Sequence, residues 1–259
     1  MPMFDSHMIL TIVGVAFVGG LIGLDRTAVG QFMISQPIVA GPLTGWILGD
    51  AVAGFVMGVV LELIWVLDMP IGAFVPADAT ISTVSATAIA ALGSPGGASL
   101  PVIGFSILLT TAMVPATMKA DGIIRHWNSR LADALVVGPG PDMRRTLVRA
   151  HLSGLPVFFL KSFVLCLVFL PAGIAAVSAF NHFPESVHRA MSLFVKLLPL
   201  VGAALVVRKL SIRTVDLFFV SGFVIAAVAG LLFHVPAIII ILLTMTGGWL
   251  GARYRERRS

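Results

Sequence analysis

Three carboxylic acids stand in one of the most apolar stretches of this chain, LELIWVLDMPIGAFVPADATIS. They are Glu62, Asp68 and Asp78, and a fourth acid, Asp50, precedes them at the end of LTGWILGD. No lysine or arginine occurs in the interval that contains them, so no neighbour in the sequence can neutralise them. An ionisable group at the centre of a membrane segment costs at least about 2.5 kcal/mol, and such groups usually face a polar cavity. We therefore expect a ligand site here, formed by acids without cationic partners.

Each acid also has a structural interpretation. Asp50 and Asp78 each precede an apolar helical pattern, and Asp78 follows Pro76, so both acids fit the N-cap position of a helix. Asp68 ends a helical run just before a Met-Pro pair, where solvation at the membrane surface is the alternative to a binding role. Glu62 lies inside VMGVVLELIWVL, where we expect no capping role, and it is the strongest site candidate.

Hydroxyl and amide groups accompany these acids. The segment ATISTVSATA after Asp78 contains five hydroxyl residues, among them Thr80 and Ser82, and no charge. Such residues in a membrane helix usually pack and form hydrogen bonds between helices, and pore lining is the alternative. Gln36 precedes a proline at the start of another apolar run, and the prolines of this region indicate helices broken at membrane depth. Acceptor groups beside an aromatic ring such as Trp65 suit a neutral polyol, and a cation is the alternative ligand.

The composition of the chain requires a membrane. Of its 259 residues 58% are hydrophobic and 11% charged, and the mean hydropathy is +1.03; soluble domains are roughly a quarter charged. The basic pI of about 10.1 fits loops that face the cytoplasm better than a nucleic-acid partner. We find no nucleotide-binding loop, nucleophile elbow or metal-ligand spacing, so we expect no catalytic centre, cofactor or metal site. The single cysteine, Cys166, is expected to be a buried, inert thiol.

About nine apolar segments predict an all-α polytopic membrane protein, with residues 1–259 forming a single membrane domain. Some of the segments are too short to span alone and are expected to be broken or re-entrant. Whether the second, third and fourth segments cross the membrane or re-enter it is left open, and a turn at membrane depth would have to be buried in protein or wet. The segments are residues 8–24, 37–49, 51–67, 70–92, 99–118, 153–179, 190–207, 214–232 and 236–251.

The basic residues predict the topology. If the N-terminus is outside and every segment crosses, most of them fall in inside loops, which places the C-terminus in the cytoplasm. The longest of these loops is 119–152, in which apolar residues such as Ile123 and Trp127 recur at helical spacing, with Arg125 and Arg130 between them. This pattern predicts a cytoplasmic amphipathic helix that lies in the membrane interface. A docking platform for a cytosolic partner is an alternative compatible with it.

The motifs QPIVAGPLTGWILGD, GxxxGxxLELI at 54–64 and MPIGAFVPADATIS resemble, in this order, those of subunit IIC of the mannose/fructose/sorbose family of the bacterial phosphotransferase system. The resemblance is dense over residues 30–92 and looser elsewhere. It implies a permease subunit in the bacterial inner membrane that works with a membrane subunit IID and with cytosolic IIA and IIB proteins. It also implies that phospho-IIB phosphorylates the sugar on release, so that this chain itself carries no phosphoryl group.

The family motifs fall on Glu62 and Asp78, on Asp50 in the LGD motif and on Gln36 at the start of that element. The leading hypothesis is therefore a sugar-translocating subunit, part of a homo- or hetero-oligomer, that binds a hexose-like sugar in the element 37–92. A cation- or proton-coupled secondary transporter with the same carboxylates, and a scaffold that recruits a cytosolic partner, are the alternatives. The candidate sugar-binding residues are Glu62, Asp78, Asp68, Gln36, Asp50, Thr80 and Ser82.

Overall fold

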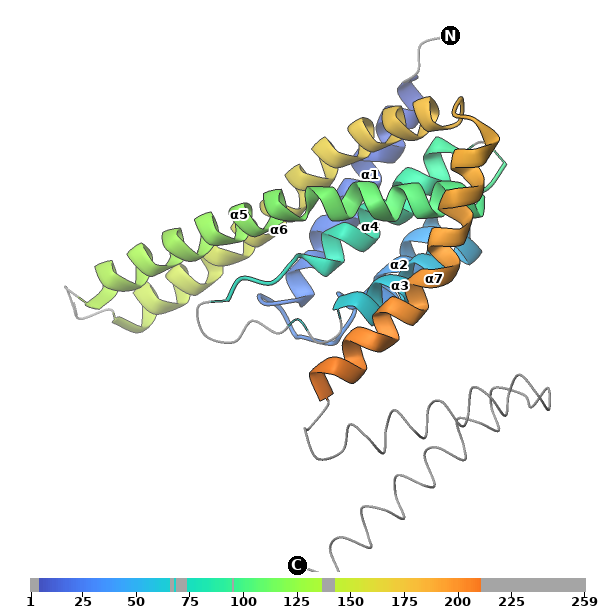
Figure 1. Ribbon diagram of the computed structural model, residues 1–259. Coiled ribbons are helices and arrows are strands. Elements are labelled where there is room, and N and C mark those ends of the chain that lie inside the picture. Colours follow the sequence, from blue (N-terminus) through green and yellow to red (C-terminus); the bar gives the residue numbers. More distant parts are fainter. Residues whose placement is uncertain (1–4, 66–67, 69–73, 95, 137–142, 211–259) are drawn as a thin grey trace, which may run out of the picture. The chain divides into compact units, whose positions relative to one another are not determined.

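The computed structural model describes residues 5–65, 68, 74–94, 96–136 and 143–210 (Figure 1). All regular structure in this part of the chain is helical, as predicted. Seven helices match the first seven apolar segments in order, and the segments 214–232 and 236–251 lie outside the described residues. The helices are α1 (Ser6–Asp25), α2 (Pro37–Ile47), α3 (Ala51–Trp65), α4 (Ala79–Gly93), α5 (Leu100–Val136), α6 (Met143–Phe180) and α7 (Glu185–Leu210).

Four of these helices, α1, α5, α6 and α7, are long and apolar enough to cross a membrane. The other three have 11, 15 and 15 residues, which correspond to about 16–23 Å at about 1.5 Å per residue. The hydrocarbon core of a bilayer is about 30 Å thick, so α2, α3 and α4 are too short to span it alone. Nine crossing segments are therefore not confirmed: the described residues provide four spans and three short apolar helices.

The short helices α2 and α3 form an antiparallel hairpin whose backbones touch. A Cβ atom on Gly45 would lie 2.8 Å from the Cα of Gly54, and one on Gly41 would lie 2.9 Å from the Cα of Gly58. Small residues allow this close approach of two helices within a membrane. At the open end, a Cβ on Gly58 would lie 2.6 Å from the carbonyl oxygen of Pro37. The last turns of α3 therefore lie beside the first turn of α2.

Helix α4 occupies the centre of the described fold, since it contacts α1, α2, α3, α5 and α6. Its residues belong to two hydrophobic clusters, with Ile89 in one and Ile81 and Val84 in the other. The second cluster includes the thiol of Cys166, which is fully buried as predicted. Because helices surround α4, the residue that begins it, Asp78, is also buried.

Helices α5 and α6 have 37 and 38 residues and lie side by side (Figure 1). Most of the predicted 119–152 loop is contained in them, because α5 continues through Val136 and α6 begins at Met143. The predicted amphipathic helix thus exists as the continuation of α5, and the described residues 119–136 and 143–152 all belong to α5 or α6. The reason is local: no proline occurs between 116 and 136, and the charges that begin at Lys119 do not end a helix.

The glycine contacts of the hairpin predict a difference between two identical substitutions. In Gly54→Ala the new methyl group would lie 2.9 Å from the Cα of Gly45, so the two helices must separate. In Gly14→Ala, in α1, the methyl group meets nothing within 4 Å. We expect the first variant to lower the melting temperature of the purified protein, consistent with overpacking costs of about 1–3 kcal/mol, and the second to leave it unchanged or higher. Equal melting temperatures for the two variants would contradict the packing described.

Candidate functional site

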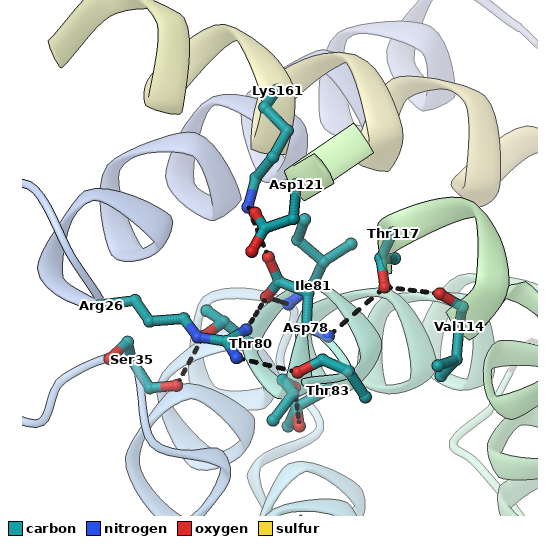
Figure 2. Close-up of polar contacts among 12 residues, drawn as sticks. Arg26, Ser35, Asp78, Thr80, Ile81, Thr83, Val114, Thr117, Asp121 and Lys161 are labelled. Carbon is teal, nitrogen blue, oxygen red and sulfur yellow. Dashed lines mark hydrogen bonds and ion pairs between the residues drawn. The ribbon is translucent and has the colours of Figure 1, made fainter. Parts of the chain in front are cut away.

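A cluster of four charged side chains surrounds the start of α4 (Figure 2), with Asp78 buried and the other three half-buried. Lys161 Nζ lies 2.7 Å from Asp78 Oδ2 and 2.7 Å from Asp121 Oδ1, while Arg26 Nη1 lies 3.1 Å from Asp78 Oδ1. We call these four residues the charge cluster. Asp78 is also the N-cap of α4, because its Oδ1 accepts a hydrogen bond from the Ile81 N–H at 3.1 Å. Two positive and two negative groups balance, which is the condition for charges to be buried without a large penalty.

The charge cluster corrects the expectation that the acids lack cationic partners. That expectation is wrong for Asp78, whose partners come from α6 and from the end of α1 and so are remote in the sequence. The N-cap role predicted for Asp78 is confirmed. Arg26, Asp121 and Lys161 were missed as site residues. The available signal was Lys161 in the apolar run VFFLKSF, because charges inside membrane segments usually pair with one another.

Backbone groups hold the charge cluster in place. The Arg26 Nη2 donates to the carbonyl oxygen of Ala77 at 2.9 Å, and the Asp78 N–H donates to Thr117 Oγ1 at 3.3 Å. These two contacts fix the residues that lead into α4 against α1 and α5. The guanidinium group of Arg26 therefore binds both the carboxylate of Asp78 and the peptide before it.

The segment between α1 and α2 is fixed to the same region. Asp25 accepts hydrogen bonds from the N–H groups of Phe32, at 2.6 Å, and Ser35, at 3.0 Å. Thr80 Oγ1 in turn donates to the carbonyl oxygen of Ser35 at 2.8 Å. The hydroxyl hydrogen of Thr80 is thus engaged within the protein.

Asp50 is engaged at both of its carboxylate oxygens. Oδ1 accepts from the Ala53 N–H at 3.1 Å, which confirms the predicted N-cap of α3, and Oδ2 accepts from the Ala98 N–H at 2.8 Å. The side chain therefore ties the turn between α2 and α3 to the segment that precedes α5. Asp50 lies about 18 Å from Glu62 along α3, at about 1.5 Å per residue.

Glu62 lies at the open end of the hairpin, and its Oε2 accepts a hydrogen bond from the Ile38 N–H at 3.1 Å. The expectation that Glu62 has no capping role is therefore wrong: it binds a free N–H in the first turn of α2, the neighbouring helix. The sequence could not show this contact, because it arises from the packing of the two helices. Gln36 is the N-cap residue of α2 through its backbone, and its exposed side chain forms no capping hydrogen bond.

Trp65 follows Glu62 by three residues at the end of α3, so the two side chains lie on the same side of the helix. The indole Nε1 of Trp65 is buried and has no hydrogen-bond partner among the described residues. Asp68 is half-buried, and its N–H donates to the Trp65 carbonyl oxygen at 2.9 Å. We call Gln36, Glu62 and Trp65 the hairpin end. It combines a half-buried carboxylate, an exposed amide and an indole N–H without a partner in the described part of the chain.

The seven predicted site residues therefore do not form one group. Asp78 and Thr80 lie at the charge cluster, Asp50 lies at the closed end of the hairpin, and Gln36 and Glu62 lie at its open end. Ser82 is a buried residue of α4, and its hydroxyl has no partner in the described part of the chain. Residues 5–65, 68, 74–94, 96–136 and 143–210 contain no cluster of three or more His, Cys, Asp or Glu side chains that could hold a metal ion.

Removal of Lys161 tests the energetic importance of the charge cluster. Lys161→Met leaves the carboxylates of Asp78 and Asp121 without their shared cation, and breaking a buried pair in this way costs about 3–5 kcal/mol. We expect a large loss in the free energy of unfolding, and a partial recovery in the double variant Lys161→Met/Asp121→Asn. The control is Arg189→Gln, which breaks the exposed ion pair with Glu185 and should change stability by less than about 1 kcal/mol. Similar losses for Lys161→Met and for the control would refute this role.

Comparison with known proteins identifies the family. A model of the family described as the sorbose-specific IIC component of the phosphotransferase system matches residues 7–246. The chain is 27% identical over 226 residues to the mannose-specific EIIC component of Escherichia coli strain K12, covering 84% of this chain and 80% of that protein. It is 26% identical over 201 residues to the sorbose-specific EIIC component of Klebsiella pneumoniae, covering 74% and 71%. It is 24% identical over 233 residues to the fructose permease IIC component of Bacillus subtilis strain 168, covering 87% and 80%.

Solved structures share the fold. A cryo-EM structure of the mannose transporter ManYZ in complex with microcin E492 matches with a TM-score of 0.54, at 20% identity and 96% coverage of both chains. A second structure, described as that of a membrane protein, matches with a TM-score of 0.72, also at 20% identity and 96% coverage of both. The match of the family model over most of the chain confirms the resemblance seen in the sequence motifs. This chain belongs to the family of sorbose-specific IIC components of the phosphotransferase system.

Proposed function

We propose that this chain is the sugar-translocating membrane subunit of a mannose/fructose/sorbose-type phosphotransferase system. It binds a hexose-like sugar and passes it inward for phosphorylation by a cytosolic IIB protein. The observation that carries this proposal is the family match over residues 7–246, and the mannose-, sorbose- and fructose-specific relatives support the substrate class. A cation-coupled transporter is not favoured, because the family is one of phosphotransferase components and the buried acid Asp78 is neutralised within the protein.

The sugar site of this proposal is the hairpin end, with Asp68 beside it. One oxygen of Glu62 holds the Ile38 N–H, which leaves the other free to accept a sugar hydroxyl. The exposed amide of Gln36 can both donate and accept. The indole ring of Trp65 offers an aromatic face, and its N–H is a donor that has no partner among the described residues. A few polar groups around an apolar surface are the usual composition of a small-molecule site.

The other predicted residues support this site and do not contact the sugar. Asp50 and Thr80 are engaged in hydrogen bonds within the protein, and Asp78 is held by two cations. If one of these groups bound a ligand, its hydrogen bonds or ion pairs within the protein would first have to break. A buried group that loses its partner costs about 1–3 kcal/mol. Ser82 lies in α4, and its buried side chain packs between helices. The sugar-binding residues of the proposal are therefore Gln36, Glu62 and Asp68, with Trp65.

The partners follow from the same proposal. We assign to this chain a membrane partner of the IID type and cytosolic IIA and IIB proteins, in the inner membrane of a bacterium. The positions of the basic residues favour an external N-terminus and a cytoplasmic C-terminus. The fold shared with a chain of the ManYZ transporter is compatible with assembly beside a second membrane subunit.

A direct assay of the function uses membranes that contain this chain together with its IID, IIA and IIB partners. Radiolabelled mannose, fructose and sorbose are offered in turn, and the sugar phosphate formed is measured. We expect one of these sugars to be taken up and phosphorylated, and no product when this chain is omitted. Uptake that continues without the phosphoryl donor and follows an ion gradient would instead establish a secondary transporter.

Glu62→Gln tests the sugar site without removing the hydrogen bond to α2. The glutamine keeps one oxygen for the Ile38 N–H, so the variant should fold and assemble, but it loses the charge that strengthens the bond to a sugar hydroxyl. Hydrogen bonds to charged groups contribute about 1.5–3 kcal/mol, so we expect sugar binding to weaken roughly ten- to a hundredfold.

The matched control for this variant is Glu185→Gln, an acid-to-amide change on the exposed side chain at the start of α7. We expect it to leave uptake normal. If the Glu62 variant transports sugar as well as this control does, Glu62 does not belong to the site.

A further inference from the structure

The segment that connects α1 to α2 leads directly into Gln36, one of the proposed sugar-binding residues. It comprises residues 26–35, and we call it the connector. Its last residue, Ser35, is buried, whereas the side chain of Gln36 is exposed and forms no capping hydrogen bond. The peptide bond that joins the two residues is planar, so a group that holds the carbonyl oxygen of Ser35 also orients the backbone of Gln36.

Side chains from α1 and α4 hold both backbone groups of Ser35. Its N–H donates to Asp25 Oδ2 at 3.0 Å, and its carbonyl oxygen accepts from Thr80 Oγ1 at 2.8 Å (Figure 2). Asp25 is the last residue of α1 and is only 7% exposed. Thr80 lies in the first turn of α4, two residues after Asp78, so the charge cluster fixes it as well. Ser35 is therefore clamped between two helices.

The other carboxylate oxygen of Asp25 holds a turn within the connector. Oδ1 accepts from the Phe32 N–H at 2.6 Å. The residues on either side of Phe32 are Gln31, with φ 54°, and Met33, with φ 66°. Non-glycine residues rarely adopt such left-handed backbone angles and keep them only where surrounding contacts fix them. The carbonyl oxygen of Met33 accepts from the Gln36 N–H at 3.1 Å, so relaxation of this turn would move Gln36.

We propose that Asp25 is a positioning residue of the sugar site, which together with Thr80 clamps Ser35 and so fixes Gln36 at the hairpin end. This inference rests on the proposed function and extends it to a residue that does not touch the sugar. Without the clamp the turn relaxes and Gln36 occupies several positions, so that sugar binding must also order it. Loss of the clamp therefore raises the KM for sugar and leaves the maximal rate unchanged.

The experiment measures sugar phosphorylation in membranes that contain this chain with its IID, IIA and IIB partners, over a range of mannose, fructose or sorbose concentrations. In Asp25→Asn the amide keeps one acceptor oxygen and turns an NH2 group toward the second backbone N–H, so one of the two hydrogen bonds is lost. We expect the KM to rise about fivefold at an unchanged maximal rate. This factor corresponds to about 1 kcal/mol, the typical net contribution of one hydrogen bond.

Thr80→Val tests the other side of the clamp and keeps the test decisive if Asp25→Asn fails to fold. Its matched control is Thr83→Val, also in α4 and buried, whose hydroxyl donates to the carbonyl oxygen of Ala79 in the same helix at 2.7 Å. We expect Thr80→Val to raise the KM about fivefold and Thr83→Val to leave it unchanged. Melting temperatures of the variants establish that they are folded.

Combination with Gln36→Ala separates positioning from a general loss of stability. Gln36→Ala alone should raise the KM, and adding Asp25→Asn or Thr80→Val should raise it no further, because both act through Gln36. The inference is overturned if the effects on KM add, or if the two clamp variants behave like Thr83→Val while Gln36→Ala raises the KM. If Gln36→Ala and Glu62→Gln both leave the KM unchanged, the proposed sugar site is itself wrong, and the positioning role is refuted with it.

Discussion

The ion pairs of Asp78 with Lys161 and Arg26 are the interaction on which the arrangement of the described helices depends. Asp78 is the N-cap of α4, and α4 contacts five of the other helices, so the contacts that fix Asp78 also fix the helix at the centre of the described fold. A carboxylate buried within the protein is tolerated only with partners, and the end of α1, α5 and α6 each bring one charge to it. The charge cluster thus joins three long helices and one short helix at the point where they meet.

The second constraint is the glycine contact between α2 and α3. Two helices that are each too short to cross the bilayer become one compact unit because their backbones touch. This contact carries Glu62 to the first turn of α2, where a carboxylate is favoured by free N–H groups and by the helix dipole. At the same end of the hairpin the side chain of Gln36 is exposed, and the indole N–H of Trp65 has no partner among the described residues. The packing of α2 against α3 therefore forms the proposed sugar site. The charge cluster instead fixes α4, which packs against both helices of the hairpin.

The sequence indicated the helical class, the family and the N-cap roles of Asp50 and Asp78, because these depend on composition, motifs and local spacing. It did not reveal the pairing of Asp78 with Lys161, since the two residues come from different helices and only the fold brings them together. The capping contact of Glu62 was not foreseen for the same reason: its hydrogen-bond donor belongs to a neighbouring helix. The continuation of α5 past Lys119 was missed because a change from apolar to charged residues was read as the end of a helix, although no helix-breaking residue occurs there.

The most direct test of the central claim is a cryo-EM structure of the assembled transporter with its sugar bound. The account predicts sugar hydroxyls within hydrogen-bond distance of Glu62 and Gln36, a ring against Trp65, and the bond between Lys161 and Asp78 intact. A sugar bound instead to Asp78 or Asp50, with those internal contacts broken, would contradict it.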